Sequence, residues 1–241
     1  MIKAFISSIK SNHQFNNIYQ IFYLVILLGL IFYFWNHTIL YPFKLLVVFF
    51  HETSHALATI VTGGKVKDFV VIQQQGGYVV SDGGNRFIIL NSGYLGSLLW
   101  GLLIYTVAIK NKFNKVLMIG LGIIIGLITI VFVKNLFAVL FGLVLTAVMI
   151  LIGKYVPDRI NNFILRLIGL TSMVYVPLDI FSDTIYHARS KSDATLLADE
   201  FGGPTLLWGG LWLIICIVVL FFCLRWTLKK RITKPGSVNL E

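Results

Sequence analysis

Long apolar blocks alternate with short polar segments along nearly the whole chain. Each block has about 17 to 23 residues, and an α-helix of that length crosses a hydrocarbon layer ~30 Å thick. The pattern therefore predicts an all-α polytopic membrane protein with about six or seven spans. The predicted helices are Ile18–Trp35, Ile39–Val61, Phe87–Ile109, Val116–Val133, Leu136–Gly153, Phe163–Ile180 and Thr205–Trp226. Only Lys134 and Asn135 divide the fourth block from the fifth, so the number of spans depends on that break.

The connection Thr62–Arg86 has a different pattern from the blocks around it. Three Gly-Gly pairs frame two β-rich runs, Phe69–Ile72 and Tyr78–Val80, which predicts a β-hairpin after the second helix. An unpaired edge of this hairpin could hold an unwound substrate segment through backbone hydrogen bonds, whereas the alternative is a plain connector. The candidates for that substrate contact are Gly76, Gly77 and Tyr78.

The composition excludes an ordinary soluble domain. Apolar residues make up 57% of the 241 positions and charged residues only 12%, which is typical of a chain whose solvent is the bilayer. The net charge of +10 comes mostly from Lys and Arg between and beyond the apolar blocks, where they face lipid headgroups rather than nucleic acid. We expect one integral, multi-pass domain over residues 1–241 in the cell membrane, with a core at 39–226 and tails at 1–17 and 227–241.

The second predicted helix carries the sequence His51-Glu52-Thr53-Ser54-His55. Positions four apart lie on one helical face, so both imidazoles can bind the same metal ion. Two such histidines with a glutamate beside the first are typical of zinc metallopeptidases. The metal would lower the pKa of a water molecule, and Glu52 would pass its proton to the leaving amine. Chance produces this motif in on the order of one in a thousand sequences of this composition, so we predict Zn²⁺ as the cofactor, His51 and His55 as ligands, and Glu52 as the catalytic base.

A catalytic zinc needs a third protein ligand. Asp179 and Asp183 follow Pro177 at a spacing of four and share a face if the helix resumes. Asp179 is flanked by apolar residues at the end of a predicted span, where a carboxylate without a role is costly. We therefore predict Asp179 as the ligand, with Asp183 as the alternative. His187 and Asp193 lie further along the chain and are expected to be loop residues.

These features together resemble the site-2 protease family of intramembrane zinc metallopeptidases, and specifically a small bacterial-type branch without a PDZ domain. The resemblance extends from about Phe49 to Trp212. It rests on short blocks of sequence, namely His51–Ala56, Thr62–Val66, Gly76-Gly77, Gly93–Ser97, Asp179–Asp183, Ser192–Ala194, Pro204, Trp208 and Trp212.

The resemblance implies a zinc-dependent fold that hydrolyses peptide bonds within the membrane. In this family the third ligand comes from a Leu-Asp-Gly motif, which Leu178-Asp179 matches, although Ile180 stands in place of the glycine. Asp179 and Asp183 therefore both stay open, with Asp179 first. The predicted hairpin is also similar to a hairpin of the family, which favours its substrate-presenting role. Asn91, in the third predicted helix, is a candidate oxyanion or substrate-backbone contact by its position.

Two other functions fit parts of the pattern. The first is a catalytically inactive membrane scaffold of the same fold. The second is a metal transporter, which is less favoured because the polar groups concentrate at one motif and one aspartate pair instead of along a pathway. The expected partners are a membrane-protein or peptide substrate and the lipid bilayer. The sequence leaves the substrate, the membrane orientation and the oligomeric state open.

Overall fold

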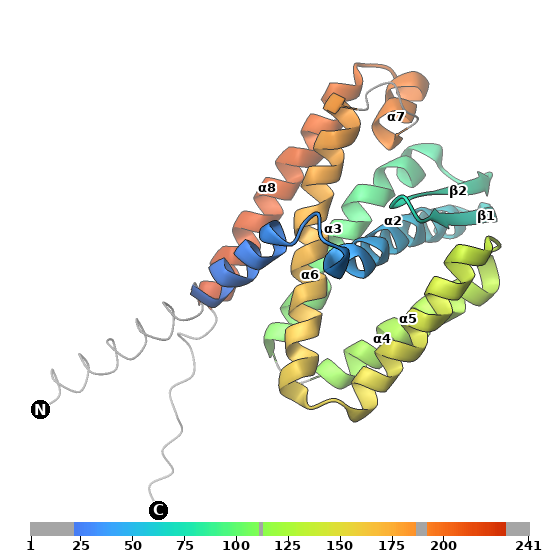
Figure 1. The fold of residues 1–241 in the computed structure, drawn as a ribbon. Helices are drawn as coiled ribbons and strands as arrows, with labels where there is room; N and C mark the ends of the chain where they lie inside the picture. The colour runs from blue at the N-terminus through green and yellow to red at the C-terminus, as the bar shows by residue number, and fades with distance from the viewer. Residues whose placement is uncertain (1–21, 111–112, 187–191, 230–241) are drawn as a thin grey trace, which may run out of the picture.

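The computed structural model describes residues 22–110, 113–186 and 192–229, and Figure 1 shows their arrangement. The long helices are α2 (Tyr41–Val61), α3 (Arg86–Lys110), α4 (Asn114–Phe132), α5 (Leu136–Tyr155), α6 (Asp158–Phe181) and α8 (Thr205–Lys229). The shorter elements are β1 (Lys65–Ile72), β2 (Gly76–Asp82) and α7 (Asp193–Phe201). A 3-10 turn at Thr38–Leu40 precedes α2, and a π-helical turn at Ser182–Tyr186 follows α6.

Six of the described helices are long and apolar enough to cross a membrane, so the chain is an integral, multi-pass membrane protein as predicted. The predicted break at Lys134-Asn135 is confirmed, because α4 ends at Phe132 and α5 begins at Leu136. A further apolar helix at Phe22–Tyr33 is shorter than a span. Residues 18–21 of the first predicted span lie outside the described residues.

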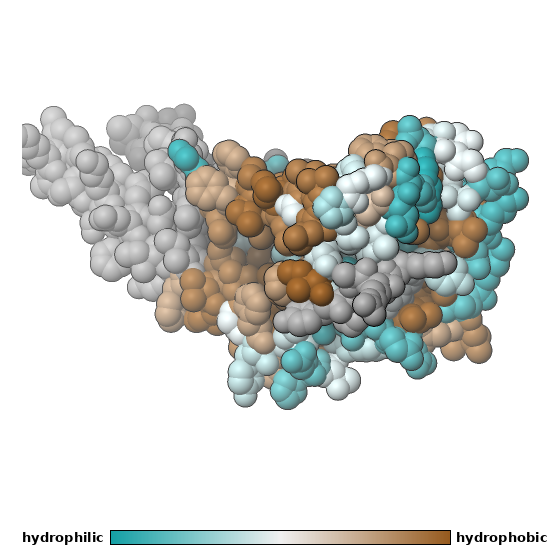
Figure 2. All heavy atoms as spheres, turned by 90° about the horizontal axis from the view of Figure 1, so that it is seen from above, coloured by the Kyte–Doolittle hydropathy of each residue, from teal (hydrophilic) through white to brown (hydrophobic). Residues whose placement is uncertain are grey.

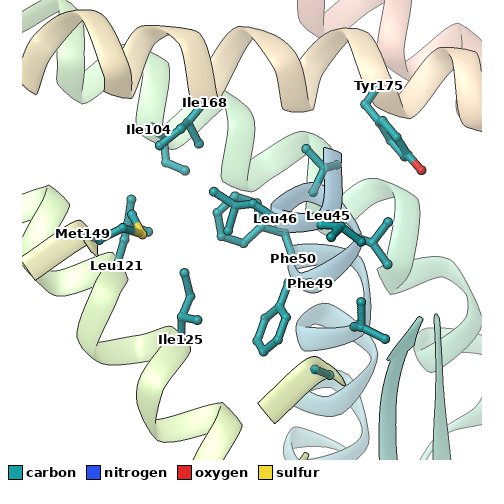
Figure 3. Packing of buried hydrophobic residues seen from close by; sticks show 14 of the residues in the cluster. Leu45, Leu46, Phe49, Phe50, Ile104, Leu121, Ile125, Met149, Ile168 and Tyr175 are labelled. Carbon is teal, nitrogen blue, oxygen red and sulfur yellow. The ribbon is translucent and has the colours of Figure 1, made fainter. Parts of the chain in front are cut away.

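Helix α2 is the most enclosed of the six. Its most apolar stretch is 72% buried, whereas the corresponding stretches of α5 and α8 are only 22% buried. Leu45 and Phe49 of α2 are fully buried and belong to one apolar cluster with Ile104 of α3, Leu121 of α4 and Ile168 of α6 (Figure 3). Because protein surrounds α2, its polar residues face other side chains instead of lipid.

The outer helices present apolar side chains to the surroundings. Large exposed ones include Ile130, Val131, Val144, Leu151, Ile214, Ile217 and Phe222. Figure 2 views the molecule from above, from the end that carries α7. Hydrophilic residues gather there on one side of the molecule, beside a hydrophobic area. Such a distribution suits a chain whose flanks contact lipid and whose ends contact water.

Strands β1 and β2 form the antiparallel hairpin that the Gly-Gly pairs predict. The pairing ends at Ile72 and Gly76, next to the turn. Phe69 and Val71 of β1 are fully buried, and the ring centroid of Phe69 lies 5.2 Å from that of Phe49. The alternation of apolar side chains along β1 therefore fixes the hairpin against α2.

The connection between α4 and α5 covers the outer edge of β1. Lys134 Nζ donates a hydrogen bond to the backbone oxygen of Lys67 at 2.7 Å, and Asn135 Nδ2 donates to that of Val71 at 2.8 Å. Val133 also forms an isolated parallel bridge with β1. Strand backbone beside membrane-spanning helices needs such partners, because no water reaches the hydrocarbon layer.

The turn of the hairpin is held from two sides. The hydroxyl of Tyr41, the first residue of α2, donates to the backbone oxygen of Gln73 at 2.8 Å. The hydroxyl of Tyr175 on α6 donates to the backbone oxygen of Gln75 at 3.4 Å. The hairpin thus folds back along α2, and its turn reaches the beginning of that helix.

Helix α7 is a nine-residue element between α6 and α8. Ser192 is its N-cap and accepts a hydrogen bond from the backbone N–H of Thr195 at 3.3 Å. Gly202 ends the helix with φ of 85°, a conformation that glycine adopts readily. Arg86 Nε donates to Glu200 Oε1 at 2.9 Å, which ties α7 to the start of α3.

Candidate active site

Helix α2 places His51 and His55 side by side, as the spacing of four predicts. Their Nε2 atoms are 3.0 Å apart, and only 6% of the surface of His55 is exposed. Two ring nitrogens that both carried a lone pair would repel each other at this distance. The arrangement is therefore suited to a proton or a cation between the rings.

Asp193, the first residue of α7, completes a triangle with the two imidazoles. Its Oδ2 atom lies 3.1 Å from Nε2 of His51 and 3.1 Å from Nε2 of His55. Burial disfavours the ionised form of Asp193, but when the imidazoles are protonated, the charge of His55 and the contacts with both rings outweigh burial and hold the pKa of this carboxyl well below its usual range. The expectation that Asp193 is a remote loop residue was wrong, because it begins a helix that packs on α3. His187 lies outside the described residues.

A hydrogen bond at the other nitrogen of the His55 ring directs its Nε2 atom toward His51 and Asp193. Its Nδ1 lies 2.7 Å from the backbone oxygen of Ile89. A carbonyl can only accept, so Nδ1 carries a proton, and in the neutral ring the lone pair is then on Nε2. Ser92 Oγ, at 3.3 Å from Nδ1, lies beside this bond. In metal sites, a hydrogen bond from the other ring nitrogen to a backbone carbonyl commonly holds a ligating histidine in one tautomer.

Gly93 of α3 leaves open the space in front of both rings. A Cβ at this position would collide with Nε2 of His51 and Nε2 of His55. The neighbouring Tyr94 packs edge-on against His51, with ring centroids 4.8 Å apart. Helix α3 therefore approaches α2 closely enough to orient the rings without filling the space between them.

The three side chains fit a divalent metal ion. Among the described residues, His51, His55 and Asp193 form a group that could hold a metal ion. They offer two nitrogens and one oxygen, all within 4.8 Å of one another. Ligand atoms ~2.0 Å from a tetrahedral zinc lie ~3.3 Å apart, close to the separations found here. Asp193 Oδ2 is also a buried atom without a hydrogen-bond partner in the described chain. Two imidazole nitrogens and one carboxylate oxygen suit a zinc ion, and three protein ligands would leave one tetrahedral position open.

Glu52 lies between this group and the hairpin. It is 3% exposed, and its Oε2 has no hydrogen-bond partner within the residues described. A Cβ added to Gly77 of β2 would lie 2.7 Å from Glu52 Oε1 and 2.7 Å from the backbone oxygen of Val70. Because Gly77 has no side chain, the backbone of β2 passes directly beside the carboxylate.

A cavity of about 260 Å³ joins these groups. The metal-ligand candidates, Glu52 and the three hairpin candidates Gly76, Gly77 and Tyr78 all line it. Asp179 and Asp183 line it as well, and the hydroxyl of Tyr94 donates to Asp183 Oδ2 at 2.5 Å. The structure thus brings both predicted aspartates to the cavity but places Asp193 in the group with the histidines. The role of Asp179 as a ligand stays a prediction.

Asn91 lies in a different environment. Its Oδ1 accepts a hydrogen bond from Trp212 Nε1 at 3.0 Å, and its Nδ2 donates to the backbone oxygen of Phe87 at 2.8 Å. The residue lines an apolar surface groove between α2 and α3 and is not among the residues that line the Glu52 cavity. The predicted substrate contact of Asn91 is untested.

Comparison with known proteins agrees with this geometry. A family model described as Peptidase M50B-like matches residues 23–223, which include every side chain of the site. Searches of curated proteins and of solved structures found no match.

Proposed function

Since the chain belongs to the Peptidase M50B-like family, we propose that it is an intramembrane zinc metallopeptidase that cleaves membrane-protein substrates. The observation that carries this proposal is the triangle of His51, His55 and Asp193 beside a buried Glu52. These are the side chains that zinc-dependent peptide hydrolysis requires, and they lie on a membrane-spanning helix and on α7.

His51, His55 and Asp193 would hold the metal ion, and the Ile89 carbonyl keeps the ring of His55 in the required tautomer. A bound zinc ion would lower the pKa of a water molecule and polarise the scissile carbonyl. The alternative is that Asp179 replaces Asp193 as the third ligand, as the family's Leu-Asp-Gly motif implies. The separations of 3.1 Å from Asp193 to both rings support Asp193.

Glu52 would act as the general base. It accepts the proton of the attacking water and then donates it to the leaving amine. Its unpartnered Oε2 atom and its burial support this role, because no salt bridge or hydrogen bond in the described chain occupies that oxygen. A metal ligand would be needed for zinc retention, whereas a base is needed only for turnover.

The outer edge of β2 would hold the substrate. The α4–α5 connection covers the outer edge of β1, but in the described residues no side chain bonds to the backbone of β2. This edge lines the cavity beside Glu52. An extended segment added there would place its carbonyl groups next to the catalytic residues. A helical segment hides its carbonyl groups, so the substrate must unwind locally before cleavage.

Peptide cleavage by a Glu52→Gln variant tests the proposal. Purified protein in detergent would be incubated with a mixture of single-span membrane peptides, and the fragments would be identified by mass spectrometry. We expect wild type to release fragments and Glu52→Gln to lose roughly 10²- to 10⁴-fold in rate, the contribution typical of a general base. Both proteins should contain equal zinc.

Two results would contradict the proposal. Unchanged cleavage in Glu52→Gln would show that the fragments come from a contaminating protease. Zinc-loaded wild type that cleaves none of the peptides would favour the inactive scaffold. A metal transporter would instead move zinc across a proteoliposome membrane with or without Glu52→Gln.

A further inference from the structure

A second polar cavity lies at the opposite end of α6 from the catalytic residues. It measures about 340 Å³ and is lined by Asn114, Asp158, Arg159, Asn162 and Arg166. Arg166 is thirteen residues before Asp179, or ~20 Å along the helix. The two cavities share no lining residue. The cavity is therefore separate from the proposed catalytic centre.

Cations dominate this cavity. Asp158 contributes the one carboxylate among its lining residues, and Lys115 Nζ already lies 3.7 Å from that carboxylate. The charges of Arg159 and Arg166 remain without a carboxylate partner among the described residues, because neither forms an ion pair there. Two guanidinium groups that face one polar cavity favour an anion.

Arg166 carries the strongest indication of a missing partner. Its Nε atom is buried and has no hydrogen-bond partner in the part of the chain that is described. Its guanidinium carbon lies 5.6 Å from the ring centroid of Tyr23, a contact that leaves the N–H donors available. A buried hydrogen-bond donor without an acceptor costs free energy, and the cost is larger when the donor belongs to a charged arginine within a membrane span.

Two buried amides complete the polar wall. Asn114 is 4% exposed, and its Oδ1 atom has no partner among the described residues. Asn162 is 9% exposed and donates to the backbone oxygen of Ala108 at 2.8 Å, which fixes its side chain. The inner part of the lining, Asn114, Asn162 and Arg166, is thus buried or half-buried, whereas Asp158 and Arg159 lie exposed at the surface.

The position of the cavity indicates where the anion comes from. It is framed by the first residues of α4 and α6, just after α3 ends, so it lies where membrane-spanning helices leave the hydrocarbon layer. Arg166 is eight residues, or ~12 Å, inside α6. Helical side chains lean toward the start of their helix, and Arg166 lines the cavity together with Asp158 at that start, so we expect its guanidinium group near the level of lipid phosphates. Large apolar side chains are exposed on the same helix ends, namely Phe113, Val116, Ile160 and Phe163.

From these observations we infer that the cavity is a binding site for the phosphate group of an anionic phospholipid. Arg159 and Arg166 bind the phosphate oxygens, and the buried amides of Asn114 and Asn162 line the headgroup. The acyl chains follow the exposed apolar side chains of α4 and α6. Basic pockets between membrane helices bind anionic headgroups in this way. The site requires neither zinc nor the proposed peptidase activity.

Lipid binding by delipidated protein in detergent tests this inference. Native mass spectrometry would measure the binding of phosphatidylglycerol, of phosphatidylcholine and of inorganic phosphate to wild type, Arg159→Gln, Arg166→Gln and Lys154→Gln. Lys154 is the matched control, because it is a cation at the same end of the molecule that stacks on Tyr155 and does not line the cavity.

We expect wild type to bind phosphatidylglycerol more tightly than phosphatidylcholine. Arg166→Gln should weaken phosphatidylglycerol binding at least about tenfold, because a charge-assisted hydrogen bond is lost, and Lys154→Gln should leave it unchanged. Arg159 is exposed, so Arg159→Gln gives the same comparison if Arg166→Gln does not fold. Equal binding by wild type and both arginine variants would overturn the inference. Inorganic phosphate that binds as tightly as the lipid would overturn the lipid as its source.

Discussion

At the scale of single residues, Gly77 determines how closely the backbone of β2 approaches Glu52. A methyl group in place of its hydrogen would lie 2.7 Å from Glu52 Oε1 and from the backbone oxygen of Val70. Either the strand or the carboxylate must then move. A methyl group on Gly210 of α8, by contrast, would have no atom within 4 Å.

Gly77→Ala should therefore lower the rate of peptide cleavage by roughly 10²-fold, since a displacement of about 1 Å at a catalytic group has effects of this size. Gly210→Ala is the matched control, because Gly210 lies on α8 away from the cavity, and it should keep the rate within about threefold. Zinc content should be unchanged in both, because neither glycine contacts the ligand group. Equal rates for the two variants would show that β2 does not position Glu52.

The sequence predicts the local part of the proposed site but does not indicate that Asp193 lies beside the two histidines. His51, Glu52 and His55 are recognised because their geometry depends only on helical spacing. Asp193 reaches the same point through the packing of α7 on α3, which no short-range pattern encodes. Its one local signal was Ser192, a favoured N-cap residue, directly before it. That signal predicts a helix start but not what the helix contacts.

At the scale of elements, the α4–α5 connection positions the hairpin. Asn135 Nδ2 donates to the backbone oxygen of Val71, whose residue pairs with Gly77 across the hairpin. Asn135→Ala removes this bond and leaves a carbonyl without a partner beside the spans. We expect the Michaelis constant for a peptide substrate to rise several-fold while zinc content stays constant.

Lys115→Ala provides the control for this prediction. Lys115 lies near the other end of α4, and its ion pair with Asp158 is exposed, so its loss should change stability by less than about 1 kcal/mol. A rise in the Michaelis constant confined to Asn135→Ala would support a positioning role. Equal effects in both variants would indicate a general loss of stability instead.

The elements themselves were largely predictable, and the reasons differ between helices and hairpin. Apolar blocks of membrane length predict spans because an unsatisfied backbone is excluded from lipid. The Gly-Gly pairs predicted the hairpin. Its position along α2, however, depends on hydrogen bonds that the side chains of Tyr41, Lys134 and Asn135 donate to its backbone, and these residues belong to other parts of the chain. Helix α7 was not predicted, since nine residues are too few for a clear periodic pattern.

At the scale of the whole molecule, the proposed metal site joins the two halves of the chain. His51 and His55 lie on α2, whereas Asp193 lies on α7, after four further membrane-spanning helices. Helix α7 is held by the Arg86–Glu200 ion pair and by its contacts with α3 and α8. The site can therefore form only when the bundle has assembled, and metal content reports on the whole fold.

The zinc content of detergent-purified protein tests the central claim most directly. Wild type would be compared with His55→Ala, Asp193→Ala, Asp179→Ala and Asp183→Ala by elemental analysis, with size-exclusion profiles as a check on folding. The account predicts about one zinc per chain in wild type, a loss in His55→Ala and Asp193→Ala, and retention in Asp179→Ala and Asp183→Ala. Loss in Asp179→Ala with retention in Asp193→Ala would assign the third ligand to Asp179 instead, and well-folded wild type without zinc would contradict the metallopeptidase account.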